Sequence, residues 1–159
     1  MKLLSDFTKP IKTLNLKHKI NIMKLNPYLA FNGNCEEAIN FYKDVLDGEI
    51  IIMMRYSEAP PETFPVSEDM KNLVMHCTLV FNGLTILASD NIHSKPGNNF
   101  SLSINTDDEE QAVALFNSLS EKGQIIMPFN NVFWGGKFGM LLDKFGVQWM
   151  ISTDHSTEA

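Results

Sequence analysis

Hydrophobic and polar residues alternate with two different periods along the chain. Short apolar or alternating runs predict strands, and apolar residues at helical spacing predict helices. In the first half of the chain, a helix is predicted within 33–48, and strands are predicted at 27–31, 49–55, 73–81 and 84–89. Asn82-Gly83, between the last two strands, favours a two-residue hairpin turn because both turn residues need positive φ. The order is strand, helix, strand, strand, strand.

The second half of the chain repeats this order. A helix is predicted within 106–123, an aromatic loop at 128–136, and strands at 100–104, 124–127, 137–143 and 147–152. Matching residues lie 73 apart at the first strand (Leu29 and Leu102) and 75 apart at the turn glycines (Gly48 and Gly123). This duplication predicts an α+β fold of two tandem βαβββ modules, at about 24–90 and 98–154. Because neither module can bury its sheet face alone, we expect a curved mixed sheet around a cleft.

Charge divides the chain into a basic opening and an acidic body. Residues 1–24 hold six lysines against one aspartate, and the rest holds seven Lys or Arg against eighteen Asp or Glu, a net charge of −11. Such an acidic body argues against a nucleic-acid partner. We expect residues 1–23 to be a disordered tail, or an artefact of an upstream start before Met23, and residues 24–154 to form a single domain. A basic arm for a membrane surface or nucleic acid is the alternative.

Two further features favour a cytoplasmic protein. No apolar run approaches the roughly 20 residues that span a bilayer, and the first residues do not have the pattern of a signal peptide. Cys35 and Cys77 are isolated, without CxxC spacing, and are predicted to be free thiols. We therefore expect no membrane partner.

Three segments, in this order, resemble one protein family. They are NPYLAFNGNCEEAINFYKDVLDGE at 26–49, VMHCTLVFNGLTILASD at 74–90 and WGGKFGMLLDKFGVQWMI at 134–151. Together they resemble the vicinal-oxygen-chelate superfamily of glyoxalase I, extradiol dioxygenases and fosfomycin- and bleomycin-resistance proteins, and within it the PhnB-like branch. The resemblance implies a glyoxalase/dioxygenase-like fold. Members of this branch often carry the label 3-demethylubiquinone-9 3-methyltransferase-like, but this sequence lacks the glycine-rich strand-to-helix loop that would hold a nucleotide cofactor.

The resemblance also locates the superfamily's metal ligands. Its metalloenzymes use one residue from the first and one from the last strand of each module, usually His or Gln and then Glu. Here these positions are predicted to fall on Asn26, Leu87, Asn99 and Met150. Two amides, a leucine and a thioether are poor donors for a hard divalent ion. We therefore expect no metal and no other cofactor; a one-residue shift of the alignment would add Gln148 alone.

His76 is the candidate catalytic residue. It lies in a predicted strand in which Val74, His76, Thr78 and Val80 share one face, where an imidazole could act as a general base or hold a ligand. Asp90 is the candidate carboxylate to orient it. The alternatives are a buried structural histidine and a strand-end aspartate. Arg55, the sole arginine, could clamp an anionic substrate or pair with the acidic loop beside it.

A ligand pocket is predicted on the open face of the sheet. Its predicted lining residues are Tyr28, Ala30, Thr78, Asp90, Ser101, Ser103, Gln148 and Met150. Phe133 and Trp134, in the aromatic loop, are predicted either to wall this pocket or to pack at a subunit interface. Trp149 is predicted to point the other way, into the core.

These features predict a PhnB-like protein that binds a small organic molecule in a metal-free pocket and forms a homodimer. The alternative is a lyase, isomerase or dioxygenase of the same superfamily, with a shifted metal site or a mechanism based on His76. A third hypothesis is an interaction module that uses the aromatic loop as its interface. The superfamily hosts unrelated chemistries, so membership alone does not choose among these.

Overall fold

The first module has the predicted βαβββ order. The computed structural model describes residues 23–60, 62 and 66–153, so nearly all of the predicted basic tail lies outside the described residues. The elements of the first module are β1 (Tyr28–Phe31), α1 (Cys35–Val45), β2 (Glu49–Arg55), β3 (Val74–Phe81) and β4 (Leu84–Asp90). They form a sheet of order β1-β4-β3-β2, in which β1 is parallel to β4 and the other neighbours are antiparallel.

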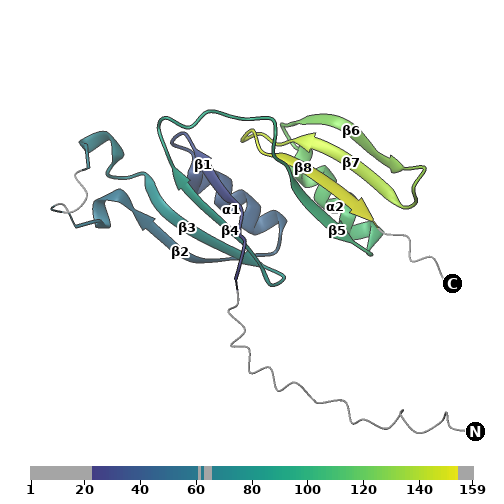
Figure 1. Ribbon diagram of the computed structural model, residues 1–159, viewed down its shortest axis with the longest axis horizontal. Helices are drawn as coiled ribbons and strands as arrows, with labels where there is room; N and C mark the ends of the chain where they lie inside the picture. Colours follow the sequence, from purple (N-terminus) through teal and green to yellow (C-terminus); the bar gives the residue numbers. More distant parts are fainter. Residues whose placement is uncertain (1–22, 61, 63–65, 154–159) are drawn as a thin grey trace, which may run out of the picture.

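The second module repeats this topology. Its elements are β5 (Leu102–Thr106), α2 (Glu109–Ser120), β6 (Gln124–Asn131), β7 (Lys137–Leu142) and β8 (Gln148–Thr153), with sheet order β5-β8-β7-β6. The two sheets lie side by side with both helices on one face, and the 91–101 connection crosses between the modules at the top of Figure 1. The predicted α+β fold of two tandem modules is confirmed, although the hydrogen-bonded strands form two separate four-stranded sheets.

Two short 3-10 helices, Tyr56–Glu58 and Glu68–Met70, lie in the acidic connection between β2 and β3, which was predicted to be a loop. No helix of the described residues is long and apolar enough to cross a membrane.

The strand after α2 is longer than predicted. It was expected to end at Met127, with Pro128 opening a loop, but β6 continues to Asn131. The register with β7 shifts between Met127 and Asn130, so Pro128 sits at an irregularity of the outermost strand of the sheet. A proline has no N–H to donate, and an edge strand tolerates it because only one side of the strand is paired.

The modules can be matched through the hydrogen bonds at their strand ends. The carboxylate of Asp90, the last residue of β4, accepts a bond of 2.9 Å from the backbone N–H of Val74, the first residue of β3. In the second module the hydroxyl of Thr153, the last residue of β8, accepts one of 2.9 Å from the N–H of Lys137, the first residue of β7. Val74 therefore corresponds to Lys137, and Asp90 corresponds to Thr153, each 63 positions later in the chain.

This match corrects the repeat offset of the first strand. Leu29 pairs with Ala88, and Ile104 pairs with Ile151, which lies 63 residues after Ala88. Leu29 therefore corresponds to Ile104, 75 residues later, and the predicted match to Leu102 is wrong. The sequence similarity between Leu29 and Leu102 does not reflect equivalent positions. The register of a strand is set by its pairing with a neighbouring strand, which is distant in the sequence.

One hydrophobic core runs through both modules. Apolar residues at helical spacing on α1 and α2 face the sheets, as the spacing predicts. Trp149 is 1% exposed, which confirms its predicted place in the core. Its ring packs edge-on against Tyr42 of α1 with the centroids 5.4 Å apart, so an aromatic contact joins the two modules. The fully buried large side chains are Trp149, Tyr42, Ile39, Leu79, Leu119, Leu141, Ile151, Val74, Cys35 and Cys77.

Candidate functional site

A cavity of about 580 Å³ lies between the two modules and is called the seam cavity below. Three segments form its walls: residues 29–34 at the end of β1, residues of the 91–101 connection, and residues 145–148 before and at the start of β8. Two of the predicted pocket residues, Ala30 from the first module and Gln148 from the second, come together here. Its size is within the usual range for sites that bind small molecules.

The connection between the modules is held along β1. The backbone N–H of Asn91 donates to the carbonyl of Phe31 at 2.6 Å, and the hydroxyl of Ser94 donates to the carbonyl of Ala30 at 2.8 Å. Gly146 has φ of 85°, a conformation that favours glycine, and lies beside Pro96 of the connection. These contacts place the connection beside both β1 and the β7–β8 loop, and residues of all three segments line the seam cavity.

Phe145 gives the seam cavity a fixed aromatic surface. Its ring packs edge-on or tilted against Phe31, Phe41 and Tyr42, with centroid distances of 6.4, 5.6 and 5.9 Å. The ammonium group of Lys144 lies 5.0 Å from the centroid of the Phe145 ring, within the range of a cation–π contact. Three aromatic neighbours leave this ring little freedom to turn.

Asp143 is a buried carboxylate that joins the modules. It is 3% exposed and accepts bonds from the hydroxyl of Tyr42 (2.6 Å), from Nε1 of Trp149 (2.8 Å) and from the N–H groups of Phe145 and Val147 (2.9 Å each). The pKa of Tyr42 is raised by burial and then by this carboxylate, so its hydroxyl stays protonated and donates. Asp143 thus positions the loop that walls the seam cavity.

The sequence did not predict this role of Asp143. Asp143 belongs to the segment at 134–151 that resembles the PhnB-like branch, and Tyr42 lies in the apolar stripe of the helix predicted within 33–48. The available signal was a phenol in the middle of that stripe, because a buried tyrosine hydroxyl needs a hydrogen-bond partner.

Asp90 is a second buried carboxylate, and its predicted place beside His76 is wrong. It is 2% exposed, and besides Val74 it accepts bonds from the N–H groups of Gly33 (3.0 Å) and Cys35 (2.9 Å). It therefore caps the start of α1 from β4, where Asn34 makes no side-chain cap bond. Asp90 is a strand-end residue with a structural role, as the alternative interpretation had it, and its carboxylate does not face an open pocket.

Both cysteines are free, as predicted, and the structure shows that both are buried. Burial raises the pKa of the Cys77 thiol to about 11. The pKa of Cys35 is also raised, first by burial and then by the nearby carboxylate of Asp90. Because the thiolate is the reactive form, neither thiol is an activated nucleophile at neutral pH.

His76 lies away from the seam cavity, half-buried on β3. Its Nε2 is 3.2 Å from Oγ1 of Thr78, and its ring centroid is 6.1 Å from that of Tyr28. The structure thus brings together three residues that the sequence singled out. Val74 does not share this face: the register with β2 shifts after His76, and Val74 is 1% exposed in the core.

The aromatic loop does not line the seam cavity or either of the two further cavities between the modules, of about 590 and 450 Å³. Phe133 is 96% exposed and Trp134 is 60% exposed, and their rings contact each other edge-on at 4.7 Å. The loop joins β6 to β7, and β6 is the strand farthest from the first module (Figure 1). The predicted pocket wall is wrong for these cavities because strand order, which the sequence does not specify, puts this loop at the outer edge.

The remaining candidates are distributed over other parts of the surface. Ser103 lines two further cavities, of about 590 and 450 Å³, also between the modules, and it pairs with Met150. Ser101 lies just before β5. Arg55 donates to the carbonyl of Asn72 at 2.7 Å and pairs with Glu36 at 2.8 Å, which occupies its guanidinium.

The superfamily's metal positions do not converge in this chain. Asn26 lines the cavity of about 450 Å³ and Asn99 lines the seam cavity. With the corrected offset of 75, the counterpart of Asn26 is Ser101 rather than Asn99. The four predicted positions contain no carboxylate or imidazole, the donors that a divalent metal prefers, and replacing Asn99 by Ser101 in the set adds none. Over the described ranges, no three His, Cys, Asp or Glu side chains gather as a metal site would require.

The model of a protein family described as 3-demethylubiquinone-9 3-methyltransferase matches residues 23–152. The chain belongs to this family. A solved structure of protein PA1353 from Pseudomonas aeruginosa is 36% identical, with a TM-score of 0.75, over 84% of this chain and 98% of that one. A putative family member from Bacillus cereus, named PhnB protein, is 31% identical, with a TM-score of 0.69, over 82% of this chain and 99% of that one. The predicted PhnB-like resemblance is confirmed.

The wider superfamily is confirmed at the level of the fold. A glyoxylase/bleomycin resistance protein/dioxygenase domain from Frankia sp. EAN1pec is 11% identical, with a TM-score of 0.59, over 86% of this chain and 96% of that one. The methyltransferase named in the family description is not assigned to this chain. In this chain the connections from β1 to α1 (residues 32–34) and from β5 to α2 (residues 107–108) contain one glycine in total. A loop that binds a nucleotide cofactor is glycine-rich.

Proposed function

We propose that this PhnB-like protein binds a small organic molecule in the seam cavity, without a metal or other cofactor. The observation that carries the proposal is a cavity of about 580 Å³ that is lined by residues of both modules, including Phe145, and by the connection between the modules. Ligand sites are commonly found where two structural units meet, and they combine apolar surface with a few polar groups. Ala30 and Gln148, predicted from sequence as pocket residues, support the location.

Phe100 offers a test that leaves the core intact. Its ring lines the seam cavity and is 58% exposed, so Phe100→Ala removes ligand contact without creating a buried hole. We expect Phe100→Ala to weaken binding of a flat aromatic probe such as 2-naphthamide by about threefold or more. Isothermal titration calorimetry of both proteins measures this. Equal affinity of the variant and the parent for every bound probe would place the ligand elsewhere.

A second candidate function is catalysis at His76. The observation that favours it is the 3.2 Å contact between Nε2 of His76 and the Thr78 hydroxyl, beside the ring of Tyr28. An imidazole so placed could act as a general base toward a bound substrate. On this hypothesis His76→Ala abolishes turnover and leaves the melting temperature nearly unchanged. Retained turnover, or a large fall in melting temperature together with lost turnover, would speak for a structural histidine.

We also propose that the protein is a cytoplasmic homodimer. Supporting observations are the exposed aromatic pair Phe133 and Trp134, after the end of the edge strand β6, and the exposed Ile125, Ile126 and Met127 near the start of that strand. Aromatic and apolar side chains are enriched in the cores of subunit interfaces. Two free thiols fit a reducing compartment, and the net negative charge fits a protein without a nucleic-acid partner.

The aromatic pair provides the test of the dimer. The double change Phe133→Ser and Trp134→Ser should turn a dimer into a monomer, measured by light scattering after size-exclusion chromatography. The matched control is Ile92→Ser, which removes an apolar side chain of 45% exposure from the connection between the modules. A parent protein that is monomeric at high concentration, or a double variant that stays dimeric, would contradict this interface.

A further inference from the structure

The charged side chain that lines the seam cavity is positive. Among the described residues that line it, Lys95 is the charged one, and the other polar lining side chains are Ser94, Asn32, Asn34, Asn99 and Gln148. The buried carboxylate of Asp90 lies behind Gly33, where three backbone N–H groups already compensate it. An ammonium group and several amides, without a lining acid, favour a ligand that carries a negative charge.

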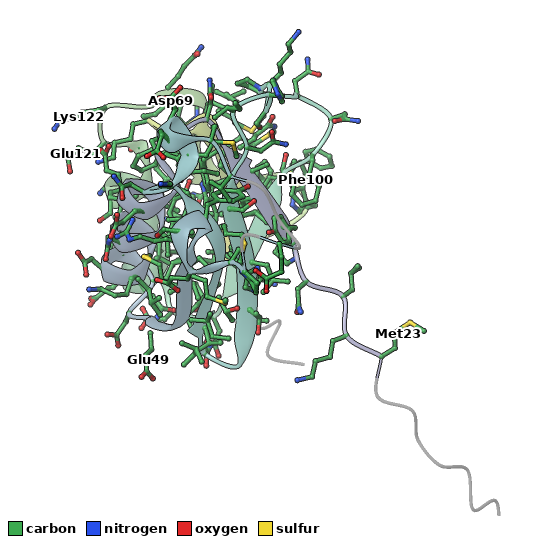
Figure 2. All side chains as sticks on the ribbon, turned by 90° about the vertical axis from the view of Figure 1, so that its left-hand side faces the viewer. Met23, Glu49, Asp69, Phe100, Glu121 and Lys122 are labelled. Carbon is green, nitrogen blue, oxygen red and sulfur yellow. The ribbon has the colours of Figure 1, made fainter. Side chains whose placement is uncertain are left out.

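The cavity also offers two aromatic surfaces. Phe145 is held by neighbouring rings, and Phe100 lies at the rim, where its ring projects from the body on the side opposite Lys122 (Figure 2). Phe31 and the ring of Pro96 add apolar lining. Flat apolar ligands bind well against aromatic faces because rings stack with little loss of side-chain freedom.

We propose that the ligand of the seam cavity is a small aromatic carboxylate. Its carboxylate pairs with the ammonium group of Lys95 and accepts bonds from lining amides, and its ring lies against Phe145 and Phe100. This inference rests on the proposed function, and it adds the sign of the ligand's charge and the residue that recognises it. Lys95 is well placed for this role, because it lies on the connection that Ser94 holds against β1.

Two probes that differ by one charge test the inference. They are 2-naphthoate and its neutral amide, 2-naphthamide, each titrated calorimetrically into the full chain. We expect the parent to bind the naphthoate more tightly, and Lys95→Gln to lose roughly three- to fivefold in affinity for it, as for a solvent-exposed ion pair. Affinity for the amide should not change. The preference should shrink in 0.5 M salt, as screening requires.

Control variants separate this inference from the proposed function. Lys122→Gln removes an exposed lysine on the opposite side of the molecule and should change neither affinity (Figure 2). Equal binding of both probes, both weakened by Phe100→Ala, with no effect of Lys95→Gln, would overturn the inference and leave the proposed function standing. Failure of both probes to bind would overturn both.

Discussion

Replacing Asp143 by Ala is expected to lower the free energy of unfolding by about 4 kcal/mol or more, since each buried donor left unpaired costs about 1–3 kcal/mol. The change leaves four donors without their acceptor: the Tyr42 hydroxyl, the Trp149 indole N–H and the N–H groups of Phe145 and Val147. Two of the four are backbone groups of the loop that walls the seam cavity. Urea denaturation followed by circular dichroism measures the loss.

A matched aspartate separates this effect from a general loss of charge. Asp44→Ala removes an exposed carboxylate on α1, whose side chain is 73% exposed, and should change stability by less than about 0.5 kcal/mol. Tyr42→Phe removes one donor of the same network, and its cost should be about 1 kcal/mol. If Asp143→Ala costs no more than Asp44→Ala, the carboxylate does not hold the modules together.

Replacing Asp90 by Ala is expected to cost about 3 kcal/mol or more, because three backbone donors, two of them in buried hydrogen bonds, lose their acceptor. They are the N–H groups of Gly33 and Cys35, before and at the start of α1, and that of Val74 at the start of β3. A carboxylate at the N-terminus of a helix also interacts favourably with the helix dipole, and this contribution is lost too. The same denaturation measurement applies.

The repeat supplies the control for Asp90. Thr153 holds the corresponding place in the second module but accepts one bond, from the N–H of Lys137, while α2 is capped by its own Asp108. Thr153→Ala should therefore cost about 1 kcal/mol. Equal losses for Asp90→Ala and Thr153→Ala would mean that the bonds to the helix start contribute little.

The order of elements was predictable because it depends on local patterns. The helical spacing around Ala38, the turn residues Asn82-Gly83 and the alternation that buries Trp149 are all visible within about ten residues of sequence. The offset of the first strand was wrong because strand register depends on pairing between Leu29 and Ala88, and between Ile104 and Ile151, which similarity between the two halves does not reveal.

The candidate site was predictable only in part, for the same reason. Ala30 and Gln148 were predicted as pocket residues, and both line the seam cavity. The role of Asp90, the position of Trp134 and the network around Asp143 depend on strand order and on hydrogen bonds between distant residues. Every buried backbone N–H group needs an acceptor, but which side chain supplies that acceptor can be identified only once the three-dimensional structure is known.

The two buried carboxylates give the seam cavity its walls. Asp90 fixes the turn from β1 into α1, and Asp143 fixes the loop from β7 into β8 against the same helix. Both segments line the cavity, so two of its three walls are tied to α1 by hydrogen bonds to these carboxylates. Rigid walls favour ligand binding because little freedom is lost when the ligand enters.

The most direct test of ligand binding in the seam cavity is a titration of ¹⁵N-labelled protein, dialysed against a chelator, with 2-naphthoate while backbone amide shifts are recorded. We expect the largest shift changes at Ala30, Gly33, Gly146 and Gln148, which line the cavity from both modules. Largest changes at His76 and Thr78, or binding that appears only after a divalent metal is added back, would contradict it.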